Sequence, residues 1–404
     1  MEIKKVTNSK LMVYAYFVVI FVVLFFTTTS DHKEYGTFRA EEIGAVQKII
    51  NPEFYDGKLF NMESMKDNPY FNYAYMVAFV AKKFGYQQNL WELGKIFWFV
   101  EKGISLIVII MLCNLIFPGD RITLLIAGTF FVSFIDHEAT QKSMAMPLYL
   151  LAIYYFLKER WIVTAIFSAS IFYLHVGKGV WWLGAAGFAL LAMFLIQKRI
   201  SLKNIIIFGF TTVALASPIL YYYFLKNSNS SIDKFTIMYF YYIQQWQTSP
   251  LLALTITPFT FFNQWLTFAI LCLGYISAKK AGYDHRNILL LAMGAIVLYF
   301  VQFVFADVLS SSFIIPMQLT RAFHVVQVFG NLFIAFLLAG HIRKGNYIFV
   351  SLFLFMYLTH HSHKSIFLSI ILLIFYEILE KPAKDLAEKI FCRVKIDLGN
   401  LRKR

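Results

Sequence analysis

Long, uninterrupted runs of apolar residues are the dominant pattern of this chain. About ten of them approach or exceed the ~17–25 residues that cross a bilayer as a helix. They are continuous rather than alternating, which excludes a transmembrane β-barrel. The pattern predicts an all-α fold, a polytopic transmembrane helical bundle with about twelve crossings. The crossings are predicted at residues 11–28, 96–117, 122–136, 144–157, 161–176, 179–196, 204–225, 251–277, 287–306, 322–341, 346–359 and 365–379.

Composition supports a membrane protein and excludes most soluble classes. Of the 404 residues, 59% are hydrophobic and 15% are charged, whereas soluble domains have roughly 45–50% and about 25%. The three cysteines lie in predicted helices or in the C-terminal tail, so we expect no disulfide framework and no metal site of the cysteine type. We find no P-loop and no internal repeat, so an ATP-driven motor and a transporter with repeated halves are not indicated.

The distribution of positive charge predicts the orientation. The first run lacks a small-residue cleavage site and follows Lys4, Lys5 and Lys10, which is typical of a retained signal anchor with a cytoplasmic N-terminus. With twelve crossings both termini are cytoplasmic. Inner segments then hold 22 of the 37 Lys and Arg residues, and short outer loops hold six. The net charge of +14 is therefore explained by cations in the predicted cytoplasmic segments of a protein of the cytoplasmic (inner) membrane. No nucleic-acid partner is needed to explain it.

We expect a single domain over residues 1–404, comprising a signal anchor (1–28), an extracytoplasmic loop (29–95), the remaining crossings (96–379) and a basic tail (380–404). Apolar residues recur in the tail at three- to four-residue spacing. The tail is therefore either an amphipathic helix on the inner leaflet or a simple stop-transfer anchor.

The first outer loop is unusually long and holds nine of the chain's 23 carboxylates. Phe38, Ile43, Val46 and Ile50 recur at helical spacing, and Asn51-Pro52 ends the predicted helix. A second stretch, residues 70–84, is aromatic and apolar but short, which favours a helix at the outer membrane interface. Two such helices would form a structured roof over the membrane domain.

This order of features resembles the N-terminal part of the GT-C glycosyltransferases, which are integral membrane enzymes. The resemblance rests on the adjacent acids Glu41-Glu42 in the first loop, on "NPYFNYAYMVAFVAKKFG" at 68–85 and on "MAMPLYLLAIYYFLKERW" at 144–161. It covers roughly the first 200 residues. It implies a polyprenyl-phosphate-linked sugar as donor. We expect no cofactor, and the sequence does not indicate a divalent cation. The chain departs from the family pattern in having Glu-Glu where many members have Asp-Glu.

The chemistry of such a transfer requires a carboxylate and cations. The acceptor hydroxyl needs a base within hydrogen-bond reach, and the leaving phosphate needs positive charge. Glu41 and Glu42 cannot share one helix face, so one of them is the expected base, and Asp31 is the rival candidate. The alternative is that all these acids are solvated loop surface.

Cations and polar residues in the outer loops supply the rest of the predicted site. Arg321 offers a planar fork of donors for phosphate oxygens, although a structural role at the headgroup level explains it equally well. The polar turns at 134–147 and 174–179 have two interpretations. They line one water-filled cleft, or they are ordinary water-exposed turns. A divalent cation at Asp136, His137 and Glu138 is not favoured, because consecutive residues rarely converge on one metal. The donor-phosphate candidates are Arg321, Lys142, Lys178 and Arg39, and the substrate-binding candidates are His137, His175, Tyr242 and Gln245.

The sequence thus predicts glycosyl transfer from a polyprenyl-phosphate-linked sugar to a glycan, lipid or protein acceptor, with membrane lipids around the bundle. A polysaccharide polymerase or O-antigen ligase is the first alternative, although its large loop is expected later in the chain. A lipid-linked sugar flippase or another transporter is the second. A transporter should carry polar groups at mid-membrane, whereas here they gather at the outer ends.

Overall fold

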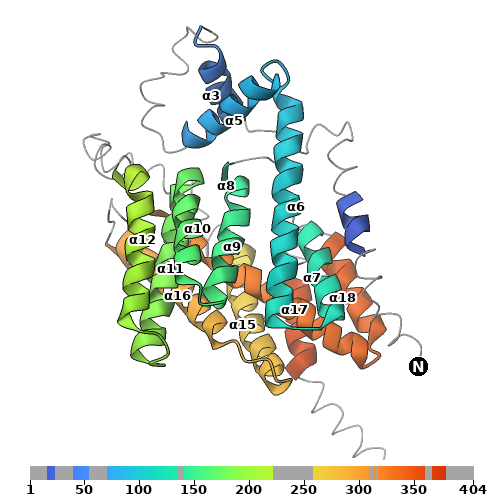
Figure 1. Cartoon of the computed structure of the whole chain (residues 1–404). Helices are drawn as coiled ribbons and strands as arrows, with labels where there is room; N and C mark the ends of the chain where they lie inside the picture. Colours follow the sequence, from blue (N-terminus) through green and yellow to red (C-terminus); the bar gives the residue numbers. More distant parts are fainter. Residues whose placement is uncertain are drawn as a thin grey trace, which may run out of the picture.

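The computed structural model describes residues 16–22, 40–53, 71–133, 141–221, 258–309, 311, 314, 317–359 and 366–378. Within these ranges the regular structure is helical throughout, as the apolar pattern predicts. Figure 1 shows most helices packed as an upright bundle, with α3 (Ala40–Ile50) and α5 (Phe71–Phe84) beyond one end of it. We call this end of the bundle the roof end and the other the foot end.

Helices α3 and α5 coincide with the two helical segments predicted in the first loop, and they pack against each other. Helix α3 ends at Ile50, directly before Asn51-Pro52, and α5 is followed by Gly85, whose φ of +78° suits glycine. Lys82 Nζ donates a hydrogen bond to the Ile49 carbonyl at 3.1 Å, which ties α5 to the end of α3. A hydrophobic cluster joins both helices to the upper part of α6 (Leu90–Ile116), with Val46, Tyr73, Val77, Ala81, Leu93 and Trp98 buried in it.

The first half of the bundle follows the predicted order. After α6 come α7 (Arg121–Ser133), α8 (Gln141–Met144), α9 (Met146–Leu157), α10 (Trp161–Leu174), α11 (Val176–Leu195) and α12 (Leu202–Tyr221). The predicted crossing at 144–157 matches α9 to within two residues, and the break between α8, which ends at Met144, and α9, which begins at Met146, was not predicted. Pro147 explains the break, because proline lacks the amide hydrogen and its ring clashes with the carbonyl four residues earlier.

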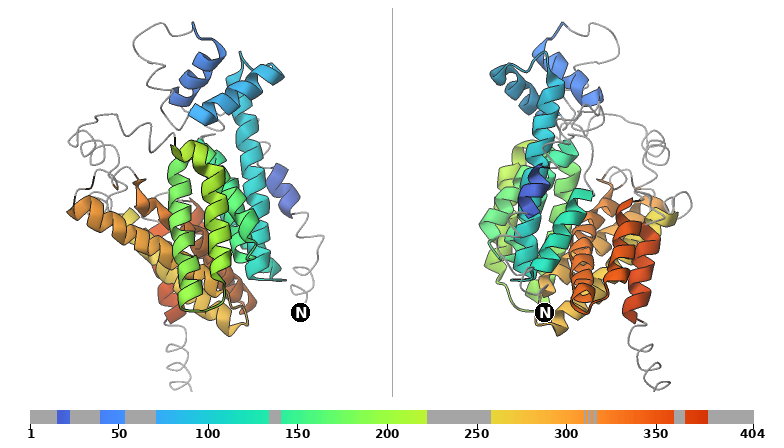
Figure 2. Two further views of the ribbon diagram at one scale, coloured as in Figure 1. Left: turned by 60° about the vertical axis from the view of Figure 1, so that its left-hand side comes forward. Right: turned by 90° about the vertical axis from the view of Figure 1, so that its right-hand side faces the viewer.

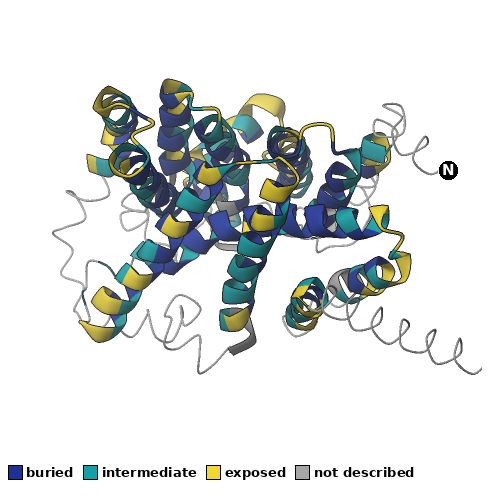
Figure 3. Ribbon diagram, turned by 90° about the horizontal axis from the view of Figure 1, so that it is seen from below, coloured by how far each residue is buried: buried dark blue, intermediate teal, exposed yellow. Residues whose placement is uncertain are grey.

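The second half contains α15 (Pro258–Lys280), α16 (Arg286–Gln302), the π-helix η4 (Phe303–Val308), the 3₁₀-helix η6 (Leu319–Phe323), α17 (His324–Arg343) and α18 (Tyr347–Thr359). Figure 2 shows the two halves as adjoining groups, and α11 packs on α16 where they meet. Helix α17 packs on α7, α15, α16 and α18 and is the most deeply buried of the long helices. Figure 3 shows the exposed residues mainly along the outer rim of the bundle.

Six helices in the described part are long and apolar enough to cross a membrane: α6, α11, α12, α15, α16 with η4, and η6 with α17. Five further described helices are apolar but shorter, at Arg121–Phe131, Met146–Leu157, Trp161–Leu174, Tyr347–Met356 and Ile366–Ile378. These results establish a helical bundle of membrane-spanning composition. The count of twelve crossings remains a prediction, because the first predicted crossing at 11–28 is described only over residues 16–22.

Candidate functional site

A buried ion pair lies near the middle of α6. Glu101 is 1% exposed and Lys102 is 6% exposed. Lys102 Nζ lies 2.9 Å from Glu101 Oε2, and Ser105 Oγ donates to Glu101 Oε1 at 3.2 Å. Charges inside a membrane-spanning helix are costly and usually mark a functional site. The pair therefore deserves a functional explanation.

Lys178 is the second buried ammonium group of this region, and it projects from the first turn of α11. His175 begins that helix as its N-cap, with Nδ1 accepting a hydrogen bond from the Lys178 amide at 3.0 Å. The Lys178 side chain is 3% exposed; its Nζ lies 3.6 Å from Met146 Sδ and 5.8 Å from the centre of the Tyr149 ring. Lys178 also interacts electrostatically with Glu101, so α6 and α11 share one patch of charge.

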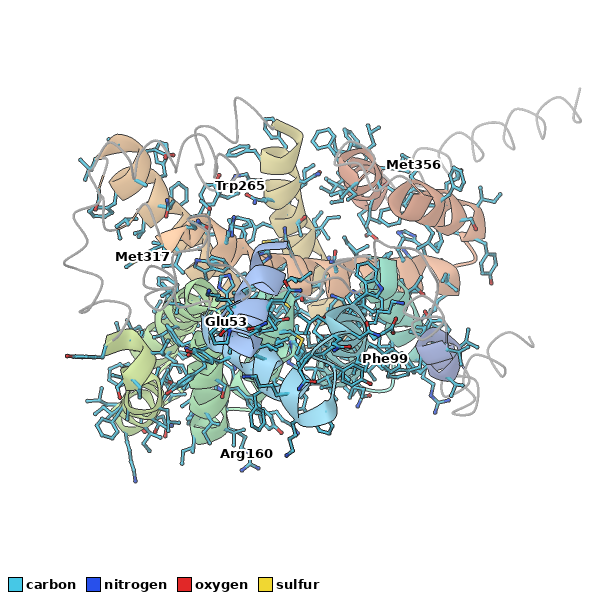
Figure 4. The ribbon with its side chains drawn as sticks, turned by 90° about the horizontal axis from the view of Figure 1, so that it is seen from above. Glu53, Phe99, Arg160, Trp265, Met317 and Met356 are labelled. Atoms are coloured by element: carbon cyan, nitrogen blue, oxygen red, sulfur yellow. The ribbon has the colours of Figure 1, made fainter. Side chains whose placement is uncertain are left out.

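Trp181, one turn further along α11, lies close to Arg321, His175 and His324. The Arg321 guanidinium carbon lies 5.7 Å from the centre of the Trp181 ring, a cation–π distance. The rings of His175 and His324 lie 5.5 Å and 6.0 Å from the same ring. Trp181 Nε1 donates to the Met317 carbonyl at 2.6 Å, which fixes the segment before η6 on α11. Figure 4, seen from the roof end, labels Met317 beside the segment that leads into η6.

We call this set the cationic cluster, defined by Glu101, Lys102, Tyr149, His175, Lys178, Trp181, Arg321 and His324. It contains three permanent cations and two histidines for one carboxylate. Its members come from α6, α9, α11, η6 and α17, and they lie in the half of the bundle nearest α3 and α5. Such an arrangement suits a phosphate, because guanidinium and ammonium groups form charge-assisted hydrogen bonds with phosphate oxygens.

The cluster brings together three of the predicted site residues: Arg321, Lys178 and His175. One expectation about them is corrected. The segment 174–179 was expected to be an outer turn, but Lys178 is helical and buried. Arg321 is partly buried against Trp181, because η6 packs between α11 and α16.

The remaining predicted site residues are not placed by the structure. Glu41 and Glu42 belong to the first turn of α3, but their side chains lie outside the description. The same holds for the side chain of Lys142 in α8. The other predicted residues lie outside the described ranges altogether: Asp31, Arg39, Asp136, His137, Glu138, Tyr242 and Gln245.

Sequence reasoning missed Glu101 and Lys102, although a signal was present. The inner segments, short outer loops and long first loop together account for 36 of the 37 Lys and Arg residues, and Lys102 is the one left over. It falls within the predicted crossing at 96–117, beside an acid. Tyr149 was also missed; its hydroxyl is fully buried and has no hydrogen-bond partner among the described residues.

At the foot end, ion pairs and hydrogen bonds fasten the helix connections. Asp284 accepts a hydrogen bond from Tyr275 at 2.7 Å, and this bond, reinforced by Arg286, holds the pKa of the Asp284 carboxyl below its ordinary value. His285 Nε2 lies 3.0 Å from the Ile116 carbonyl at the end of α6, and burial lowers the pKa of His285. These contacts join neighbouring helices and present no excess of charge, so we assign them a structural role.

Within the described ranges no group of three or more His, Cys, Asp or Glu side chains is placed to hold a metal ion. Comparison of the chain with protein-family models, with curated proteins and with solved structures finds no match. The functional argument therefore rests on the cationic cluster and on the order of elements around it.

Proposed function

We propose that this protein is a membrane glycosyltransferase of the GT-C type, which moves a sugar from a polyprenyl-phosphate-linked donor to a glycan, lipid or protein acceptor. The observation that carries the proposal is the cationic cluster, which places Arg321, Lys178 and Lys102 near one end of a membrane-spanning bundle. The phosphate of a lipid-linked donor lies where the bilayer meets water, and the proposal places the cluster at that depth. Helices α3 and α5 of the first loop lie beyond that end, where an acceptor would approach.

In the proposed mechanism the donor phosphate binds Arg321 and Lys178. A carboxylate from the first loop (Glu41, Glu42 or Asp31) accepts the proton of the acceptor hydroxyl while its oxygen attacks the anomeric carbon. The bond between that carbon and the phosphate oxygen breaks, and the electron pair leaves with the phosphate. Arg321 and Lys178 stabilise the additional negative charge that develops there.

The proposal requires the roof end to face away from the cytoplasm. We propose twelve crossings with both termini cytoplasmic, as the charge distribution predicts. Reporter fusions after Lys58 and Lys234 should report an external location, and fusions after Arg199 and Lys280 an internal one. An internal signal at Lys58 would place the loop carboxylates on the wrong side and refute the proposed reaction.

Donor recognition is tested by titrating the purified protein with farnesyl phosphate and with farnesol. Arg321→Ala should weaken phosphate binding roughly 10- to 100-fold, since a hydrogen bond to a charged group contributes about 1.5–3 kcal/mol. Arg321→Lys should weaken it less, because the charge remains but the fork is lost. Arg286→Ala, at the exposed foot-end pair with Asp284, is the matched control and should bind normally. Equal affinity of wild type and Arg321→Ala would limit Arg321 to a packing role.

A lipid-linked sugar flippase is the second candidate, and one observation favours it. Glu101 and Lys102 lie inside a spanning helix, where transporters commonly carry ionisable groups. Transfer of radiolabelled sugar to an acceptor by the purified protein supports the enzyme. Donor movement across proteoliposomes without transfer supports the flippase.

A further inference from the structure

Glu101 shares its buried surroundings with two ammonium groups. Lys102 is in direct contact with it at 2.9 Å, and Lys178 is near enough to stabilise its negative charge. Each of these three residues is at least 94% buried. A buried cation requires a nearby anion, because the cost of removing it from water is several kcal/mol. Glu101 therefore serves as the internal counter-anion of this part of the cluster.

A phosphate that enters the cluster would bring a second negative charge to the same cations. Repulsion between two anions in one weakly solvated site favours protonation of the weaker acid. A sugar–phosphate–prenyl donor is a phosphodiester, which remains ionised across the neutral range. A proton taken up on binding therefore goes to the protein.

We propose that Glu101 is a placeholder anion that the donor phosphate displaces from Lys178, and that donor binding is coupled to uptake of one proton by Glu101. This inference rests on the proposed function, because it assumes that the ligand of the cluster is an anionic lipid. It assigns Glu101 a part in regulating occupancy of the donor site, separate from that of the first-loop base.

The groups around Glu101 determine where the proton goes. On α6 these are Lys102 and Ser105, and from α11 Lys178 approaches, followed by its N-cap His175. The α9 side contributes Tyr149, whose hydroxyl has no hydrogen-bond partner among the described residues. Besides Glu101, the groups of the cluster that can take up a proton are His175 and His324. The Glu101→Gln variant distinguishes Glu101 from both histidines, and the comparison is made at pH 8, above the ordinary pKa of histidine.

Isothermal titration calorimetry of the full-length protein with farnesyl methyl phosphate tests the coupling. Binding enthalpies measured at pH 8 in two buffers of different ionisation enthalpy yield the number of protons taken up. We expect close to one proton per ligand for wild type, and a Kd that rises up to about tenfold per pH unit. Glu101→Gln should bind several-fold more tightly and lose the proton uptake, because no anion has to be displaced.

Glu92→Gln is the matched control. It makes the same change on the same helix, but Glu92 lies outside the cluster, where it is half-buried and paired with Lys95. It should retain both the affinity and the proton uptake of wild type. If Glu101→Gln folds poorly, the double variant Glu101→Gln with Lys102→Met removes both halves of the ion pair and should likewise lose the proton uptake.

Three results would overturn the inference. Wild type that binds the diester without proton uptake excludes the coupling and leaves the proposed function intact. Weaker binding by Glu101→Gln would show that Glu101 supports the phosphate site rather than competing for it. Wild type that binds farnesyl methyl phosphate no better than farnesyl methyl ether would refute the donor site itself, and this inference with it.

Discussion

Gly294 of α16 tests how closely the two halves of the bundle must approach. An alanine Cβ at this position would lie 2.5 Å from the Ala185 carbonyl oxygen and 2.9 Å from its Cα, both backbone atoms of α11. An ordinary contact begins at 3.4 Å, so the two helices must separate by about 0.9 Å. Small residues at helix interfaces permit this close approach in membranes. We expect Gly294→Ala to destabilise the protein by about 1–3 kcal/mol, the usual cost of overpacking.

Two glycines of α11 provide graded controls for that substitution. A Cβ at Gly184 would meet only the end of the Leu298 side chain, at 2.8 Å, and this flexible group can move aside. A Cβ at Gly187 would meet nothing within 4 Å. Gly184→Ala should therefore cost little, and Gly187→Ala should be neutral or stabilise by up to about 1 kcal/mol through helix propensity.

The assay is thermal unfolding of the purified variants in one detergent, followed by farnesyl phosphate binding at a temperature where all are folded. Helix α11 carries Lys178 and Trp181, whereas η6 follows α16 in the chain and carries Arg321, so a wider α11–α16 spacing should also weaken phosphate binding. If Gly294→Ala and Gly187→Ala have the same stability to thermal unfolding, the tight contact between α11 and α16 is refuted.

Three further outcomes are expected. Either Glu41→Gln or Glu42→Gln should lower turnover by ~10²–10⁴-fold, as loss of a general base does, while farnesyl phosphate binding stays normal. Normal turnover by both variants would exclude this pair as the base. Trp181→Phe should lower the free energy of unfolding by about 1–3 kcal/mol, because the Met317 carbonyl loses its donor; unchanged thermal stability would show that this hydrogen bond contributes nothing. Burial lowers the pKa of His285 below its ordinary 6.5, so the unfolded chain binds the proton more readily than the folded protein. The contribution of His285 to the free energy of unfolding should therefore be constant above about pH 6.5 and fall below it. His285→Gln should flatten that pH dependence in thermal melts, and an unchanged slope would assign it to another group.

Helix positions followed from local signals and were predicted well. Asn51-Pro52 marks the end of α3, and Gly85 marks the end of α5, because proline and glycine impose backbone geometry wherever they occur. The break at Ala145 was missed because the flanking residues are apolar enough for a continuous crossing, and only Pro147 argued against it.

The candidate site was predicted in part, for a different reason. Arg321, Lys178 and His175 were selected as polar residues near helix ends, but nothing local shows that Arg321 and His175 meet on Trp181 or that Lys178 approaches Glu101. That meeting depends on contacts such as Trp181 with Met317, which are 136 positions apart. Glu101 was missed because average hydropathy over a long helix hides one buried ion pair. A search for adjacent opposite charges within apolar runs would have found it.

The length of α6 has a mechanical consequence. With 27 residues at 1.5 Å each it measures about 40 Å, longer than the roughly 30 Å of a hydrocarbon core. Its lower end is anchored where His285 meets Ile116 and where Phe117 stacks on Phe336, with ring centres 4.7 Å apart. A rod of that length that pivots by 5° about its lower end moves its upper end by about 3.5 Å, and moves Glu101 by about 2 Å. Any tilt of the upper end of α6, where α3 and α5 pack, would therefore also change the spacing between Glu101 and Lys178, by about half as much as the upper end moves.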